Sequence, residues 1–127
     1  MQLGGDTVNV NQKIEAALSD LVKDNIWPLS KPEEAETDNW ITYNPEVDVP
    51  DNFGDDIPLE WIHHIQIHWF KRGTANYLRI RKEIRRILME AGFSINDITC
   101  LKEKNNGEIT HLIFSVNIPE DDPYGET

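Results

Sequence analysis

The chain has one cysteine, Cys100, among its 127 residues. An intrachain disulfide is therefore impossible, which excludes the disulfide-rich secreted scaffolds and favours a reducing compartment. No apolar run approaches the roughly 18 residues of a membrane span, and the first residues lack the basic and apolar segments of a secretion signal. These absences predict a protein that is neither secreted by such a signal nor inserted in a membrane.

Positive charge is also missing from a large part of the sequence. Residues 32–70 contain no Lys or Arg but ten Asp and Glu, whereas residues 71–86 carry seven of the 12 basic residues. The formal net charge is −11, which argues against a general DNA-binding protein because Lys and Arg supply most of the affinity for phosphates. The chain is expected to have an acidic middle and a basic helix.

The length predicts a single domain over residues 1–127 with one hydrophobic core. Between Trp61 and Trp69, apolar and polar side chains alternate, which is typical of a half-buried strand. Gly73 follows as a turn residue, and the pattern then takes the period of an amphipathic helix that ends at Gly92. An earlier apolar stripe predicts another amphipathic helix over 10–24.

Shorter strands complete the predicted sheet. Residues 26–29 have the composition of an edge strand, and residues 40–44 that of a further strand. An Asn-Gly turn at 105–107 joins residues 98–104 to 108–118, which indicates a C-terminal hairpin. The sequence thus predicts an α+β fold, with a mostly antiparallel sheet and two amphipathic helices packed on one face. The predicted core comprises Trp61, Ile65, Ile67, Trp69, Ile84, Leu88, Leu112, Phe114 and Val116.

Residues 45–58 form the least regular stretch. They hold three Pro, one Gly and several acids, so a long exposed acidic loop is predicted here. A loop of this length is either functional or a solvated insertion. Its candidate functional acids are Asp48, Asp51, Asp55 and Asp56. Residues 1–9 and 119–127 are predicted to be flexible tails.

The histidines do not indicate a metal site. On one strand, His64 and His68 share a face but lie roughly 13 Å apart, at about 3.3 Å per residue, which is too far for one ion. His63 points to the other face. We therefore expect polar residues on the wetter face of the sheet and one satisfied histidine on the core side.

No catalytic constellation is present either. Cys100 has no His at a motif spacing, the carboxylates lie where nothing orients them, and phosphate loops, zinc motifs and triad signatures are absent. The sequence predicts no enzyme and no cofactor.

The predicted basic helix has two kinds of exposed surface. Arg79, Lys82 and Arg86 point away from its apolar stripe and are typical of solvated charge. One flank instead mixes apolar and Arg side chains, as interfaces do, although it could also be a shoulder of the core with snorkelling arginines. This candidate subunit interface consists of Leu78, Arg81, Arg85 and Met89.

The element order and two segments, Ile65-Gln-Ile-His-Trp-Phe and Ile87-Leu-Met-Glu-Ala-Gly-Phe, together carry a family resemblance. With a hairpin that closes in Ile-Phe-Ser-Val, the chain resembles the small tail-completion, or tail-terminator, proteins of long-tailed bacteriophages and prophages, which join heads to tails. The resemblance covers residues 10–118.

The resemblance implies a non-catalytic structural protein of the virion that assembles in the host cytoplasm. It implies a homo-oligomeric ring, usually a hexamer, that caps the tail tube and docks to the head connector or stopper protein. DNA would pass through without specific binding, and the acidic segment would suit such a conduit because like charge lowers phosphate affinity.

A second hypothesis is a cytoplasmic acidic binding module, such as an inhibitor that mimics DNA. The acidic segment motivates it. A mimic needs carboxylates on a rigid surface, however, and the predicted irregular loop favours the assembly protein.

Overall fold

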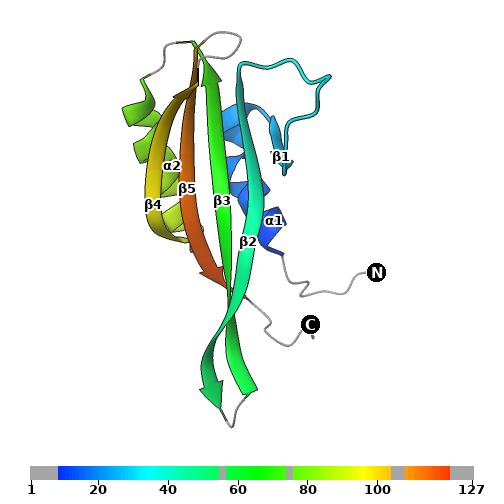
Figure 1. Ribbon diagram of the computed structural model, residues 1–127, viewed down its shortest axis with the longest axis vertical. Coiled ribbons are helices and arrows are strands. Elements are labelled where there is room, and N and C mark those ends of the chain that lie inside the picture. The colour runs from blue at the N-terminus through cyan, green and yellow to red at the C-terminus, as the bar shows by residue number, and fades with distance from the viewer. Residues whose placement is uncertain (1–8, 55–56, 74–75, 104–107, 121–127) are drawn as a thin grey trace.

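The computed structural model describes residues 9–54, 57–73, 76–103 and 108–120, and of residues 51–54 and 57–60 it describes the backbone only. The elements are the helix α1 (Val10–Leu18), a 3₁₀ turn (Ser19–Val22), β1 (Ile26–Pro28), β2 (Asn39–Gly54), β3 (Ile57–Arg72), α2 (Tyr77–Glu90), β4 (Ser94–Glu103) and β5 (Ile109–Pro119). The strands form one sheet in the order β1-β2-β3-β5-β4 (Figure 1).

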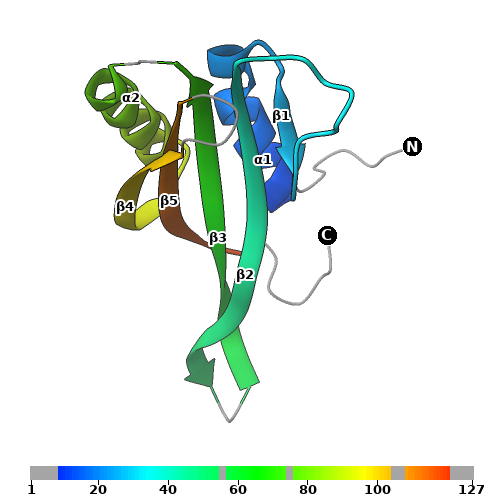
Figure 2. The ribbon, with the colours of Figure 1, turned by 45° about the horizontal axis from the view of Figure 1, so that its top comes forward.

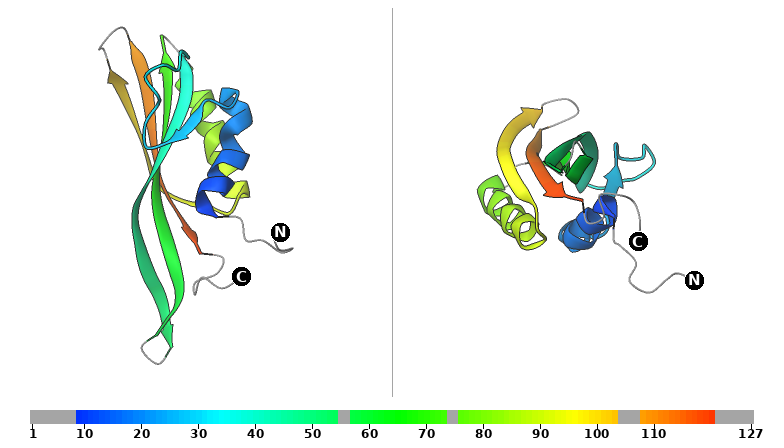
Figure 3. Two further views of the ribbon diagram at one scale, coloured as in Figure 1. Left: turned by 90° about the vertical axis from the view of Figure 1, so that its right-hand side faces the viewer. Right: turned by 90° about the horizontal axis from the view of Figure 1, so that it is seen from below.

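The sheet is antiparallel except at one edge, where the three residues of β1 run parallel to β2. Both helices lie on the same face of the sheet, as its edge-on view shows (Figure 3, left). The predicted α+β class is confirmed, and so are the edge strand at 26–29 and the two arms of the C-terminal hairpin. The turn predicted at 105–107 lies outside the described residues.

The helix ends follow local chemistry. Asn9 caps α1 through a capping box: its side chain accepts from the backbone N–H of Gln12 at 2.8 Å, and the Gln12 side chain accepts from the Asn9 N–H at 3.0 Å. At the other helix, Gly92 follows the end of α2 with a φ of 100°, a left-handed conformation that favours glycine. Both predicted helices are present, although the first, predicted over 10–24, ends as an α-helix at Leu18 and is followed by the 3₁₀ turn.

The core fills the space between the helices and the sheet. Eight of the nine predicted core residues are buried, but Trp61 is only half-buried. The reason is its position, because Trp61 pairs with Pro50 beyond the part of β3 that contacts β5. One polar link crosses the core, where the buried Tyr43 donates a hydrogen bond to the Glu15 carboxylate of α1. Burial and this bond raise the pKa of Tyr43 above its ordinary value.

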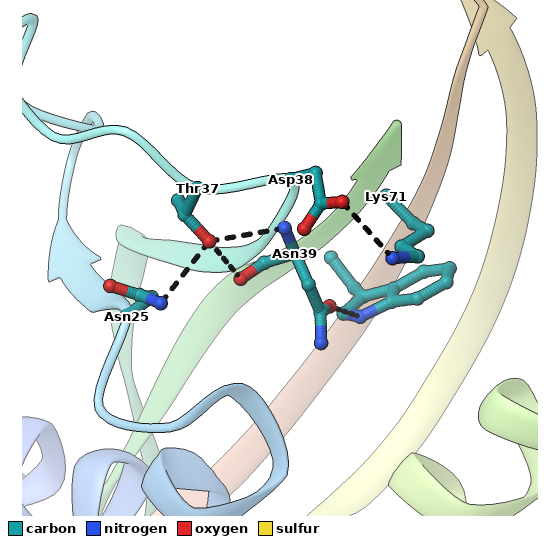
Figure 4. Close-up of polar contacts among 6 residues, drawn as sticks. Asn25, Thr37, Asp38, Asn39 and Lys71 are labelled. Atoms are coloured by element: carbon teal, nitrogen blue, oxygen red, sulfur yellow. Dashed lines mark hydrogen bonds and ion pairs between the residues drawn. The ribbon is translucent and has the colours of Figure 1, made fainter. Parts of the chain in front are cut away.

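A small polar cluster fixes the beginning of β2 (Figure 4). The hydroxyl of Thr37 accepts from the Asn25 side chain at 3.1 Å and from the Asn39 N–H at 3.2 Å, and it donates to the Asn39 carbonyl at 3.0 Å. The Asn39 side chain in turn accepts from the indole N–H of the buried Trp69 at 2.8 Å. This contact gives the indole N–H a hydrogen-bond partner that it would otherwise lack inside the core.

The predicted loop over 45–58 is wrong. β2 and β3 stay paired to Gly54 and Ile57, after a bulge between Pro45 and Val47. We call residues 47–54 and 57–64 the arm. It projects beyond the helices as a two-stranded ribbon (Figures 1 and 2). Prolines that would break a central strand are tolerated here because each strand of the ribbon has an open edge.

The predicted tails are corrected at their inner ends. Asn9 belongs to the cap of α1, and Pro119 still pairs with Ile62 at the end of β5. The remaining tail residues, apart from Glu120, lie outside the described part of the chain.

Leu88 tests the phase of α2. Because its side chain is completely buried, Leu88→Ala should lower the free energy of unfolding by about 2–5 kcal/mol in chemical denaturation. The neighbouring Met89 is 60% exposed, so Met89→Ala should change it by less than about 0.5 kcal/mol. Equal losses in the two variants would contradict this placement of the helix.

The contact between Asn39 and Trp69 should also be measurable. Asn39→Ala leaves the indole N–H without its acceptor, which should lower the free energy of unfolding by about 1–3 kcal/mol. In a Trp69→Phe background the same substitution should matter less, because the donor is gone. Equal effects in both backgrounds would show that the hydrogen bond contributes nothing.

Candidate functional site

The arm bears exposed apolar side chains. Val47 is 52% exposed and Val49 is 39% exposed. Val49 lies opposite Ile62, and Val47 lies opposite His64, so these side chains share the face of the arm that continues the helix-free face of the sheet. A two-stranded hairpin is marginally stable at best when nothing packs on it. The arm is therefore a candidate interaction surface.

Of the acids predicted to lie in a loop, Asp48 and Asp51 instead belong to the paired strands of the arm. Asp48 lies opposite His63, and Asp51 lies opposite Glu60 three residues further along. Of the remaining predicted loop acids, Asp55 and Asp56 lie outside the described residues.

A histidine fixes the base of the arm. The Nδ1 atom of His63 lies 2.8 Å from the Asp48 carboxylate of β2, and its Nε2 lies 3.2 Å from the carboxylate of Glu120, just after β5. The Glu120 N–H also donates to the Trp61 carbonyl at 2.7 Å. These contacts hold three strands together where the arm leaves the sheet, and His63 is the satisfied histidine that the sequence predicts on the core side.

A hydrogen-bonded chain of side chains crosses the helix-free face of the sheet from β4 to β2. It runs from Glu103 to His111 (2.6 Å), from His111 to His68 (2.7 Å), from His68 to Gln66 (3.2 Å) and from Gln66 to Glu46 (3.1 Å). We call these five residues the sheet-face network.

The network fixes its own proton positions. The Glu46 carboxylate only accepts, so Gln66 donates to it with Nε2 and presents Oε1 to His68. His68 then donates with Nε2, and its Nδ1 accepts from Nε2 of His111. Nδ1 of His111 in turn faces the Glu103 carboxylate at 2.6 Å.

Aromatic rings extend this network toward the sheet edge. Phe70 stacks on His111 with ring centroids 4.2 Å apart and on Trp40 at 5.0 Å. The charged groups of Lys31 and Arg72 each lie 5.6 Å from the Trp40 ring, within cation–π distance. Because Trp40 and His111 are themselves buried, the cluster is typical of a structural surface layer rather than an open ligand site.

Burial lowers the pKa of His68 below its ordinary value of 6.5, and the neighbouring His111 lowers it further, while Glu103 opposes part of the shift. The unfolded chain therefore binds a proton at His68 more readily than the folded chain does. With respect to His68, the free energy of unfolding therefore has its full value above about pH 6.5 and decreases as the pH falls below that value.

The predicted interface flank on α2 is exposed to solvent. Leu78 is 52% exposed, Met89 is 60% exposed, Arg85 is exposed and Arg81 is half-buried. Arg86, on the other side of the helix, forms an ion pair with Glu90 at 3.0 Å. The outer surface of α2 has a shallow open hollow lined by Arg79, Lys82, Glu83, Arg85, Arg86, Met89 and Glu90. The structure thus brings the four flank residues together on one surface.

Cys100 is exposed on β4, and within the parts of the chain that the structure covers, groups of three or more His, Cys, Asp or Glu that could hold a metal are absent. In these same ranges, none of the helices is long and apolar enough to cross a membrane. The arm and α2 are two candidate interaction surfaces, since both carry exposed apolar side chains.

No model of a known protein family matches the sequence, and no curated protein matches it.

Two features of the structure were not predicted from the sequence, namely the arm and the contact of His68 with His111. In Glu46-Val47-Asp48-Val49, polar and apolar residues alternate as in a strand, and this signal was outweighed by the three prolines of residues 45–58. The link between His68 and His111 needed the pairing of β3 with β5, which places residues 43 positions apart within 2.7 Å. Only the faces of these two strands followed from their own sequences.

The protonation of His68 leads to a pH test. The free energy of unfolding should fall as the pH is lowered from 7 toward 5.5, and His68→Gln should make this dependence shallower. His64→Gln, which removes a histidine from the same strand outside the network, is the matched control and should keep the wild-type slope. If the free energy of unfolding of His68→Gln has the same pH dependence as that of the wild type, His68 is not the group responsible.

Proposed function

We propose that the protein is a structural assembly protein that forms a ring on the end of a bacteriophage tail tube and joins the tail to the head. The arm is the observation that carries this proposal, because it exposes Val47 and Val49 on a ribbon that is poorly stabilised by its own chain. The resemblance of residues 10–118 to tail-completion proteins supports the same function.

The proposal assigns the protein no catalysis and no cofactor. Its partners are further copies of the chain, in a ring expected to be a hexamer, the tail-tube protein on one side and the head connector or stopper on the other. An acidic segment that faces the channel would let DNA pass because it offers few cations to phosphates. The protein would be made in the host cytoplasm and end in the neck of the virion.

One observation favours the second candidate, an acidic module that mimics DNA. Asp48, Asp51 and Glu60 belong to paired strands and not to an irregular loop, so irregularity no longer counts against a mimic. A mimic of DNA phosphates does not require exposed apolar residues among its acids, however, whereas contacts between protein subunits usually contain them. The exposed valines therefore favour the assembly protein.

Mass measurement in solution separates the two candidates. An assembly protein should give a ring at moderate concentration, visible by electron microscopy, and the ring should bind the tail-tube protein. A monomer at all concentrations that binds a nuclease or another DNA-binding protein would overturn the assembly proposal in favour of the mimic.

The flank of α2 is the expected subunit contact. Arg81→Glu with Arg85→Glu should leave the fold intact but prevent ring formation and the joining of tails to heads, because acids of the neighbouring subunit would then face like charge. The measurements are sizing and a joining assay with tailless heads. A folded double variant that still forms rings and still joins would refute this contact.

The matched control lies on the same helix. Arg79→Glu with Arg86→Glu changes the net charge by the same amount on the other exposed side of α2, so it should assemble as the wild type does. Equal loss of assembly in both pairs would indicate a general charge effect and would also refute the specific contact.

A further inference from the structure

The chain between β1 and β2 forms a loop at one edge of the sheet. We call residues 29–38 the edge loop. β1 is the edge strand at that end of the sheet, and β4 is the edge strand at the other end, where α2 contacts β4. The edge loop and α2 therefore lie at opposite ends of the sheet, on the part of the molecule away from the arm (Figures 1 and 2).

Acidic side chains occupy the tip of the edge loop. The Ala35 N–H donates to the Pro32 carbonyl at 3.1 Å, which closes a turn with Glu33 and Glu34 at its two central positions. Both glutamates are exposed, and neither forms an ion pair with any residue that the structure describes. The turn thus presents two carboxylates to solvent.

The one lysine of the edge loop is bound to the loop itself. Nζ of Lys31 donates to the carbonyls of Pro32 at 3.2 Å and Ala35 at 2.9 Å, and it lies 5.6 Å from the centre of the Trp40 ring. These contacts hold the turn in a defined shape. A surface that is already ordered loses less conformational entropy when a partner binds.

An exposed leucine lies in a strained turn next to these acids. Leu29 is 71% exposed and has a φ of 70°. The Ser30 N–H donates to the Pro28 carbonyl at 2.8 Å, so Leu29 is the central residue of a γ-turn of the rare type with positive φ. The Leu29 N–H donates to the Tyr43 carbonyl at 2.8 Å, which fixes the turn on β2. Strained residues of this kind are found most often at functional sites, so Leu29 is a candidate anchor.

The flank of α2 offers the complementary groups at a compatible spacing. Within the described ranges Arg81 and Arg85 are also without an ion pair, and Met89 is 60% exposed. At 1.5 Å per residue, Met89 lies about 6 Å from Arg85 and about 12 Å from Arg81 along the helix. In the edge loop, Glu33 follows Leu29 by four residues, so their Cα atoms are at most about 14 Å apart.

We propose that the edge loop of one copy docks on α2 of the next copy. Leu29 lies against Met89 in the shallow hollow of α2, and the two acids of the turn face Arg81 and Arg85. The inference rests on the proposed self-assembly and names the two surfaces that meet. Because unlike surfaces at opposite ends of the sheet come together, the contact is heterologous, and its repetition closes a ring when the rotation per subunit permits.

Other pairings of these surfaces are less favourable. Contact between two edge loops would place carboxylates against carboxylates, and contact between two α2 helices would place arginines against arginines, which is costly in an interface. An acidic surface of a different protein could pair with α2, but it would leave the edge loop uncovered. Only contact of loop with helix pairs opposite charges and covers apolar side chains from both surfaces.

Disulfide trapping tests this contact directly. In a Cys100→Ser background, Leu29→Cys chains are mixed with Met89→Cys chains and oxidised without denaturant. Because a disulfide requires Cα atoms within about 7 Å, the mixed disulfide should be the main product. Val47→Cys, at an arm residue that is 52% exposed, is the control and should give much less mixed product with Met89→Cys. A yield from Leu29→Cys no higher than that control, or a homodimer as the main product, would overturn the proposal.

Charge exchange provides an independent test. Glu33→Arg with Glu34→Arg should raise the midpoint concentration of assembly about thirtyfold or more, as loss of paired charges across an interface does. Adding Arg81→Glu and Arg85→Glu to the same chain should restore assembly, because the pairs form again with exchanged signs. A quadruple variant that is folded by circular dichroism but stays monomeric would overturn the pairing.

The matched control exchanges charge on the other exposed side of α2. Arg79→Glu with Arg86→Glu, added to the same loop variant, gives the same net charge but does not form the pairs again, so this chain should stay monomeric. Equal restoration by both pairs of arginine substitutions would indicate a general charge effect and would overturn the specific contact.

Leu29→Gly separates a role in the contact from a role in the fold. Glycine adopts a positive φ without strain, so the monomer should resist denaturant at least as well as the wild type. The midpoint concentration of assembly should nevertheless rise about tenfold or more, the scale expected for one buried leucine. Ser30→Gly adds a glycine next to Leu29 without removing the leucine and should assemble normally. Unchanged assembly in Leu29→Gly would overturn the anchor.

These outcomes separate the contact from the wider function. Rings that form without the mixed disulfide would overturn the placement of the edge loop and leave the assembly proposal standing. Rings held by the mixed disulfide that never join tails to heads would support the contact and count against the tail function.

Discussion

The unequal pairing of β3 determines the shape of this protein. β3 pairs with β2 as far as Ile57, but with β5 only from Ile62 to Arg72. Where both neighbours are present, the helices cover the sheet and Ile65, Ile67 and Trp69 are buried. Where β5 ends, the same strand continues with one neighbour and becomes the arm. The ladder of backbone hydrogen bonds therefore continues past the point at which apolar burial stops, and the outer part of the hairpin depends on something other than its own core.

The helix-free face of the sheet is stabilised by polar contacts instead of a second layer of helices. The sheet-face network links β4 to β2 through β5 and β3, and the stacked rings of Trp40, Phe70 and His111 continue it toward the edge. Every ring nitrogen of His68 and His111 has a hydrogen-bond partner. Because a network of this kind is costly when one member is unsatisfied, it restrains the four strands in one register and keeps the base of the arm in place.

The sequence was sufficient for elements whose periodicity had a cause within a few residues. The alternation from Trp61 to Trp69, the apolar stripe of α2 and the glycine after it correctly located the central strand, a helix and its end. The arm was missed because its stability depends on pairing between segments and because Pro45, Pro50 and Pro58 are compatible with a ribbon whose edges are open. Trp61 was assigned to the core for the same reason, since its side of the strand was correct but the length of β5 was unknown. Of the candidate surfaces, the flank of α2 followed from helical spacing, whereas the arm could be recognised only from the pairing of β2 with β3.

The segregation of charge explains how so acidic a chain could still associate with copies of itself. At a net charge of −11, two copies with evenly spread charge would repel each other in every orientation. Here ten acids lie in residues 32–70 and seven of the 12 bases in residues 71–86, so the repulsion between two copies would depend on their relative orientation. Ions screen charges separated by more than about 8–10 Å at physiological salt, so the general repulsion weakens with salt sooner than the close pairs of a formed contact. Charge would thus bias the orientation in which copies meet, and burial of exposed apolar side chains would supply the part of the affinity that salt does not remove.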